Sequence, residues 1–117
     1  MTRLRADELA KFDALLVYAN IDAIAQDQEK ALLDYVASGH GLVPLHCASY
    51  CFRNSDAWVD LVGAQFLSHS TGVFRTQIVD FDHPITRGLL PFESWDETYV
   101  HTRHNADKHV LEIRVDG

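Results

Sequence analysis

The sequence has few cysteines, few basic residues and no long apolar run. Two of its 117 residues are cysteines, too few for a disulfide framework, so the cytosol is the default compartment. Ten Lys and Arg stand against seventeen Asp and Glu, which gives a formal net charge of −7. This balance argues against binding to nucleic acid or to an anionic membrane surface. No stretch of about 18 apolar residues could cross a bilayer, and the N-terminus lacks the apolar segment of a secretory signal.

The composition favours one folded domain. A hydrophobic content of 47% excludes a disordered chain. A chain of this length can bury roughly two-thirds of its unfolded surface. We therefore expect residues 1–117 to form a single domain.

The hydrophobic pattern of the first half predicts alternating strands and helices. Apolar runs at 13–19 and 41–46 are typical of strands that are buried on both faces of a parallel sheet. Between them, residues 27–38 are predicted to form a helix that Gly39 ends. Pro44 cannot donate a ladder hydrogen bond, so we expect an irregularity or an unpaired flank there.

The second half predicts one helical stretch, at 58–63, and three strands, at 71–80, 97–101 and 109–115. Residues 71–80 alternate apolar and polar side chains, so this strand should be the more exposed one. The order implies an α/β layered fold with a parallel core. Because an open sheet of this kind usually needs about 150 residues, we expect the chain to be a fragment that is truncated at both ends.

His46 is the strongest candidate for chemistry. It follows a predicted strand, and ligands of open parallel sheets bind beyond the carboxyl ends of the strands. The alternative is a buried histidine held by backbone groups. Cys47 could act as a nucleophile, but it lacks the small flanking residues of a nucleophile elbow. Burial is the better interpretation for Cys47, and more so for Cys51.

Asp96 and Glu97 form a second candidate, at the start of a predicted strand. Adjacent residues of a strand point to opposite faces, so one carboxylate could orient a histidine or bind a sugar hydroxyl. The alternative is a solvated charged pair. His69 is a third candidate, because its neighbours are small and polar. Histidines and a carboxylate on separate loops would suit zinc or manganese, although no tight spacing supports a metal.

The remaining histidines are weaker candidates. His83 precedes a proline and is more typical of a turn than of a catalyst. His101, His104 and His109 lie near a polar run, so we expect them at the surface.

These residues resemble the ThuA-like family, which is named for trehalose utilisation. The resemblance rests on the order and spacing of six segments: 12–16, 31–43, 45–48, 58–66, 82–89 and 96–99. It implies a flavodoxin-like three-layer parallel sheet related to class I glutamine amidotransferases. It also places His46 where the amidotransferase cysteine would stand, so no glutaminase activity is inferred. Family members are linked to the breakdown of disaccharides, including 3-keto sugars.

We therefore predict a carbohydrate-processing protein that acts on a disaccharide or a 3-keto sugar, as a lyase, isomerase or hydrolase. His46 would be the base or a ligand, Glu97 or Asp96 its partner, and His69 a second polar group. We expect His46 to share a cavity with the acidic pair.

The alternative is a non-catalytic sugar- or metal-binding module on the same fold. The residues specify no cofactor and leave a divalent metal such as zinc open. The expected partner is a small-molecule carbohydrate, with no nucleic acid or membrane, and a homo-oligomer is left open.

Overall fold

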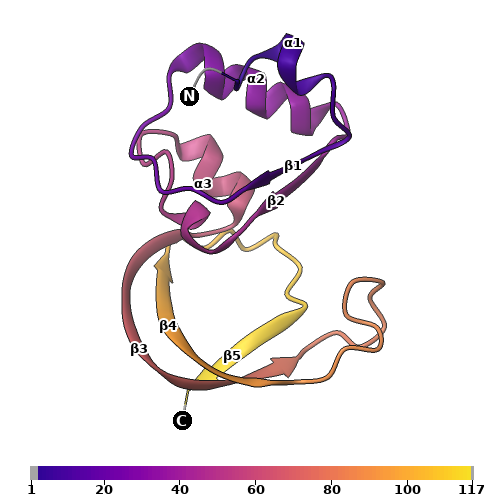
Figure 1. Ribbon diagram of the computed structural model, residues 1–117, viewed down its shortest axis with the longest axis vertical. Helices are drawn as coiled ribbons and strands as arrows, with labels where there is room; N and C mark the ends of the chain where they lie inside the picture. Colours follow the sequence, from indigo (N-terminus) through magenta and orange to yellow (C-terminus); the bar gives the residue numbers. More distant parts are fainter. Residues whose placement is uncertain (1–2, 117) are drawn as a thin grey trace. The chain divides into compact units, whose positions relative to one another are not determined.

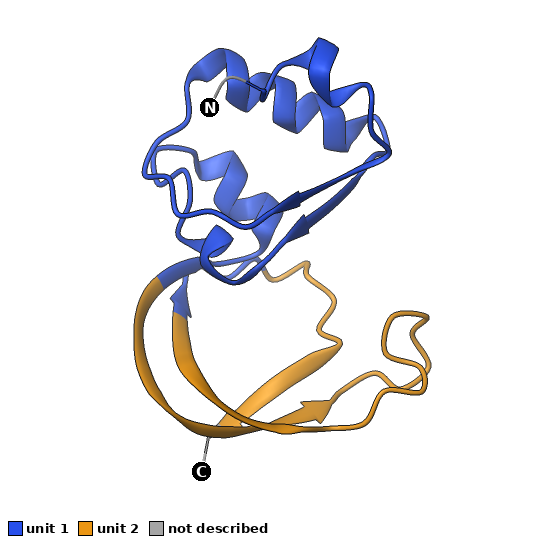
Figure 2. Ribbon diagram, in the orientation of Figure 1, with its two compact units in different colours: residues 1–66, 101–105 blue, residues 67–100, 106–117 orange. Residues whose placement is uncertain are grey.

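The computed structural model describes residues 3–116 and divides the chain into two compact units (Figure 2). Unit 1 comprises residues 1–66 and 101–105, and unit 2 comprises residues 67–100 and 106–117. No helix among the described residues is long and apolar enough to cross a membrane.

Unit 1 is built around a strand–helix–strand motif (Figure 1). Helix α1 (Ala6–Leu9) precedes β1 (Ala14–Val17), and α2 (Gln26–Ala37) connects β1 to β2 (Gly41–Pro44). The two strands pair in parallel, with Ala14 opposite Gly41. The expected parallel pairing is therefore confirmed for these two strands, and β2 ends at the proline that was expected to disturb it.

The core of unit 1 lies beneath one face of this strand pair. Leu15, Val17 and Leu42 pack against it from the sheet. Its buried members come from α2, from the chain after each strand and from α3 (Asp56–Val62): Ile24, Leu32, Ala48, Cys51, Phe52 and Trp58. The alternation of side chains along a strand explains why only one face of the pair contributes.

Local sequence signals set the ends of both longer helices. The first turn of α2 carries Asp27 and Glu29, whose charge suits the helix dipole. After its last turn Gly39 has a φ of 100°, as predicted for a residue that stops a helix. The side chain of Ser55 accepts a hydrogen bond from the Trp58 backbone N–H at the start of α3, which satisfies one otherwise unpaired donor.

Unit 2 is an antiparallel sheet in the order β4-β3-β5. Strand β3 (Gln65–Ile78) lies between β4 (Glu93–Thr102) and β5 (Glu112–Asp116). It pairs with β5 in antiparallel register, with Gln77 opposite Ile113. An ion pair of 2.7 Å between Arg75 Nε and Glu93 Oε2 links β3 to β4.

The described residues do not form the three-layer parallel sheet that the sequence predicted. Residues 3–116 contain one parallel strand pair and a separate antiparallel sheet. The strands of the second half exist as predicted, but β3 begins at Gln65 and β4 at Glu93, earlier than expected. The reason for the different pairing lies in β3, where exposed and half-buried residues alternate from Thr71 to Gln77, as in antiparallel sheets with one open face.

Candidate functional site

A histidine and a carboxylate meet on neighbouring strands of unit 2. His69 lies on β3 and Glu97 on β4, with His69 Nε2 3.8 Å from Glu97 Oε1. The ring of Tyr99 lies 5.8 Å from the His69 ring, centroid to centroid. Both members of the pair are partly exposed, at 41% for the His69 side chain and 36% for that of Glu97. Substrate and water can therefore reach them.

The backbone contact favours the tautomer of His69 that carries its proton on Nδ1, because Glu97 Oε1, 3.8 Å from Nε2, is beyond hydrogen-bond distance. Nδ1 lies 3.3 Å from the carbonyl oxygen of Ser70, and a carbonyl only accepts. Nδ1 therefore donates, and in the neutral imidazole Nε2 presents its lone pair on the side of Glu97. If Nε2 takes up a proton, the imidazolium faces a carboxylate of opposite charge.

Two expectations about this region need correction. His69 is a strand residue rather than a loop residue, and the acidic pair lies inside β4 rather than at its start. Asp96 is exposed, and its Oδ1 accepts the backbone N–H of Glu97 at 2.7 Å. Since neighbouring residues of a strand point to opposite faces, Glu97 meets His69 while Asp96 faces away from it.

His46 follows β2 in unit 1, as predicted. It opens the short 3₁₀ helix η1 (His46–Ser49) and is exposed, so the alternative of a buried histidine is wrong. Its ring stacks against Tyr18, with 6.4 Å between centroids, and Tyr18 follows the neighbouring strand β1. His46 therefore lies at the carboxyl end of the parallel pair. That it shares a cavity with Asp96 and Glu97 stays a prediction.

The backbone at His46 adopts a conformation that favours glycine, with a φ of 51°. A side chain there costs roughly 1–2 kcal/mol, and such strain often marks a functional position. We expect the free energy of unfolding of His46→Gly to be about 1 kcal/mol higher than that of His46→Ala. This difference allows for the greater entropy of glycine in the unfolded chain. Urea unfolding of the two variants measures this difference. A more stable alanine variant would contradict the strain.

Cys51 is a structural residue. Its Sγ donates to the carbonyl of Ala19 at 2.8 Å and accepts the N–H of Ile21 at 3.3 Å. Burial raises the pKa of its thiol, which keeps the nucleophilic thiolate scarce. Cys47 is only half-buried.

Iodoacetamide should therefore label Cys47 in the folded protein and reach Cys51 only after unfolding. Cys51 is 1% exposed, and its high pKa slows the reaction further. Mass spectrometry of labelled peptides with and without denaturant measures both rates in the same sample. Equal rates in the folded protein would contradict this account of Cys51.

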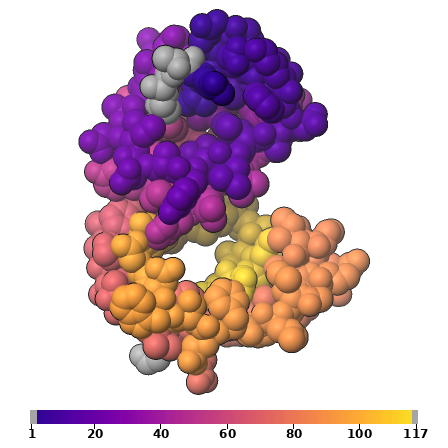
Figure 3. All heavy atoms as spheres, in the orientation of Figure 1, coloured from indigo at the N-terminus to yellow at the C-terminus, as the bar shows by residue number. Residues whose placement is uncertain are grey.

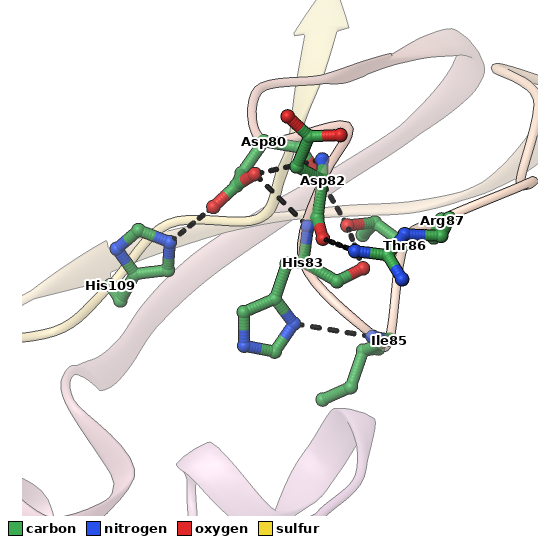
Figure 4. Close-up of polar contacts among 7 residues, drawn as sticks. All are labelled: Asp80, Asp82, His83, Ile85, Thr86, Arg87 and His109. Carbon is green, nitrogen blue, oxygen red and sulfur yellow. Dashed lines mark hydrogen bonds and ion pairs between the residues drawn. The ribbon is translucent and has the colours of Figure 1, made fainter.

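A polar network that was not expected from the sequence anchors the turn after β3 (Figure 4). Asp80 Oδ1 accepts the backbone N–H groups of Asp82 and His83 at 3.0 and 3.1 Å. Its Oδ2 accepts a hydrogen bond of 2.8 Å from His109 Nε2. The buried Thr86 donates its hydroxyl to the Asp80 carbonyl. An aspartate at this position is a recognised sequence signal for a turn. Its partner His109 is 29 positions away, and no local sequence pattern predicts their contact.

A hydrogen bond in the same turn indicates the tautomer of the His83 ring. Its Nδ1 accepts the backbone N–H of Ile85 at 3.2 Å, so the neutral ring carries its proton on Nε2. The turn assignment for His83 is therefore confirmed, because its ring helps to hold the turn.

The charge of Asp80 should make the stability of the protein depend on acid pH. The hydrogen bond from His109, followed by the N–H of Asp82, lowers the pKa of Asp80 below its ordinary 3.8. A lowered folded-state pKa contributes stability above the unfolded value and loses it as pH falls through the folded value. Wild type should exceed Asp80→Asn in unfolding free energy at pH 7, and the gap should shrink below about pH 4.

Urea unfolding of both proteins across this pH range measures the gap. Asp82→Asn is the matched control, because only the backbone of Asp82 takes part in the network, and it should track wild type. A gap that is constant with pH would contradict a role for the Asp80 charge.

The other histidines divide by exposure. His104 is exposed, and the His109 side chain is 67% exposed, so the surface assignment is confirmed for both. His101 is half-buried, and its Nε2 lies 3.1 Å from the Ser49 hydroxyl, so the surface assignment is wrong for His101. In the part of the chain that the structure describes, no three His, Cys, Asp or Glu side chains are grouped so that they could hold a metal ion.

The structure therefore brings together His69 and Glu97, and it places Asp96 on the opposite face of the same strand.

A family model described as ThuA, trehalose utilisation, matches residues 1–116. The chain belongs to the ThuA family. Membership gives it a role related to trehalose utilisation, and ThuA is a flavodoxin-like family. Neither the curated proteins nor the solved structures include a significant match to the chain.

Two segments that carry the ThuA resemblance now have a structural context. Residues 82–89 contain the turn that Asp80 anchors, and 96–99 is the stretch of β4 that contains Glu97 and Tyr99. One segment has a structural role in the described fold, and the other presents side chains with acid–base chemistry.

Proposed function

We propose that the chain processes a disaccharide in its 3-keto form, with His69 and Glu97 as acid–base groups. The observation that carries the proposal is the imidazole of His69, whose Nδ1 is held by the Ser70 carbonyl and whose Nε2 faces Glu97. Family membership supports a sugar of the trehalose type as the substrate.

The chemistry of a 3-keto sugar suits a single base. The ketone at C3 acidifies the hydrogen on C2, so a positioned imidazole can remove it. The C2–H bond breaks, the proton moves to Nε2 of His69, and the electron pair forms an enolate. The enolate returns its electrons to expel the oxygen on C1, which leaves a C1–C2 double bond and a regenerated ketone. The proton on Nε2 then passes to the leaving sugar.

Glu97 supports this step through its charge. His69 is neutral before proton abstraction and positive after it, so a carboxylate 3.8 Å from Nε2 favours the state that follows abstraction. An interaction that grows as the reaction proceeds lowers the barrier, whereas one that is constant does not.

His46 is a second candidate base, in unit 1. Its exposed imidazole and its strained backbone support the assignment. Turnover by His46→Ala tests it, and an unchanged rate would remove His46 from the chemistry without affecting the argument for His69.

The proposed function is tested by giving the wild-type chain 3-keto-trehalose and, separately, trehalose. We expect the keto sugar to be consumed and trehalose to persist, because only the ketone acidifies C2–H. Proton NMR follows both sugars over time. Binding of both sugars without consumption of either would favour the alternative of a non-catalytic sugar-binding module.

A further inference from the structure

An exposed tryptophan lies beside the histidine–carboxylate pair in unit 2. Residues two apart on a strand share a face of the sheet, so Glu93, Trp95, Glu97 and Tyr99 lie on the same face of β4. The Trp95 side chain is 68% exposed. Strand β4 lies in the orange part of the surface in Figure 3. An indole that is left in water beside polar groups is suited to stack on a ligand that has both apolar and polar atoms.

Both carboxylates beside Trp95 are matched by groups from β3. Arg75 Nε lies 2.7 Å from Glu93 Oε2, and His69 Nε2 lies 3.8 Å from Glu97 Oε1. Each carboxylate is about 7 Å along the strand from Trp95, since a strand rises 3.2–3.4 Å per residue. The indole therefore lies between two polar pairs that offer hydrogen-bond donors and acceptors on either side of an apolar ring.

This arrangement is complementary to a pyranose. One face of the sugar ring carries C–H groups that can stack on an aromatic ring, and its edge carries hydroxyls that both donate and accept. A guanidinium donates only, and a carboxylate accepts only, so the Arg75–Glu93 pair can bind neighbouring hydroxyls through both partners. The charges of the pair compensate each other, which suits a neutral ligand better than an ionic one.

We propose that Trp95, together with the Arg75–Glu93 pair, is the subsite that holds a sugar ring of the substrate beside His69 and Glu97. The inference rests on the proposed function, because it adds the binding surface to the acid–base pair. Trp95 and Arg75 take no part in the proton transfer, and their proposed role is to bind the sugar. Trp95 is a binding residue here, and its loss should raise KM more than it lowers kcat.

The two tryptophans of the chain allow a direct test. Trp58 is 1% exposed and Trp95 is 68% exposed, so acrylamide quenches mainly Trp95 in the folded protein. Titration with trehalose should shift the emission to the blue and reduce quenching, because the sugar covers the indole. Trp95→Phe retains only Trp58 and should give no such response. Mannitol, a linear polyol without a ring, should leave the emission of wild type unchanged.

Affinity gives an independent readout by calorimetry. Trp95→Ala should weaken trehalose binding about tenfold, in keeping with the loss of one aromatic contact. Phe81→Ala is the matched control, because Phe81 is also exposed in unit 2 but follows β3 in the turn region, and it should bind as wild type does. Arg75→Gln should weaken binding and leave the Trp95 emission of the free protein unchanged.

The outcomes separate this inference from the proposed function. If trehalose covers Trp95 but 3-keto-trehalose is not consumed, the subsite stands and the chemistry fails. If 3-keto-trehalose is consumed with the same KM by wild type and Trp95→Ala, the chemistry stands and the subsite is wrong. Quenching of Trp95 that trehalose does not change would also overturn the subsite.

Discussion

Replacing His69 by Asn is expected to lower the rate of 3-keto-trehalose consumption by about 10²–10⁴-fold, the range typical of a lost general base. Asparagine retains an N–H that can donate to the Ser70 carbonyl, but it has no nitrogen that can accept a proton near neutral pH. Because the His69 side chain is 41% exposed, the stability of the fold should change by no more than about 0.5 kcal/mol. Steady-state kinetics and urea unfolding of the same preparation measure both quantities.

Two companion variants sharpen this prediction. Glu97→Gln removes the charge that stabilises the imidazolium and keeps the shape of the side chain, so it should cost about tenfold in kcat, less than the loss of the base itself. His104→Asn changes an exposed histidine of unit 1 and should leave the rate unchanged. A His69→Asn variant with the full rate would remove His69 from the mechanism.

Replacing Trp58 by Ala should lower the free energy of unfolding by about 3–5 kcal/mol, the typical cost of deleting a fully buried aromatic side chain. Trp58 is 1% exposed and packs edge-on against Phe52, with 5.1 Å between the ring centroids. Its Nε1 donates to the carbonyl of Ala48 at 3.4 Å. The variant therefore loses the contacts that α3 makes with Phe52 and with η1, and leaves a cavity between them.

Urea unfolding followed by circular dichroism measures the effect without relying on tryptophan emission. Leu61→Ala is the control, because Leu61 lies on the same helix but is 37% exposed, and it should cost much less. Comparable losses for the two variants would mean that Trp58 is not at the centre of the unit 1 core.

The sequence predicted the local elements well because their signals are local. The helix expected at 27–38 is Gln26–Ala37 in the structure, and Gly39 has the positive φ that its position requires. The strand expected at 41–46 ends at Pro44. The N–H of Leu45 still donates to the Val17 carbonyl at 2.9 Å, so Pro44 occupies a position where no N–H toward β1 is needed, and the chain leaves the extended conformation at His46, with a φ of 51°. Caps, breakers and apolar periodicity act within a few residues, so one sequence is enough to read them.

The pairing of the second-half strands could not be read with the same ease. The apolar runs at 13–19 and 41–46 favour a parallel sheet, whereas the alternation at 71–80 is the usual sign of an antiparallel sheet. Residues 65–70 were missed as a strand because Ser68, His69 and Ser70 interrupt any apolar pattern. This polar part of β3 contains His69, the histidine of the candidate site.

The candidate site could be predicted as residues but not as contacts. His69 and Glu97 are 28 positions apart in the sequence, and nothing local specifies that β3 and β4 bring them together. The same holds for Asp80 and His109, whose hydrogen bond spans 29 positions. Asp96 and Glu97 were equivalent candidates in the sequence, and only the position of His69 distinguishes them.

The proposed role of His69 is tested most directly by hydrogen exchange at C2 of 3-keto-trehalose in D₂O. Mass spectrometry and NMR measure deuterium in the remaining substrate, and they detect proton removal even where no bond to the leaving sugar breaks. We expect the wild-type chain to introduce deuterium at C2, Glu97→Gln to do so more slowly, and His69→Asn to stay at the uncatalysed rate. Exchange at equal rates in wild type and His69→Asn would contradict the assignment of His69 as the base.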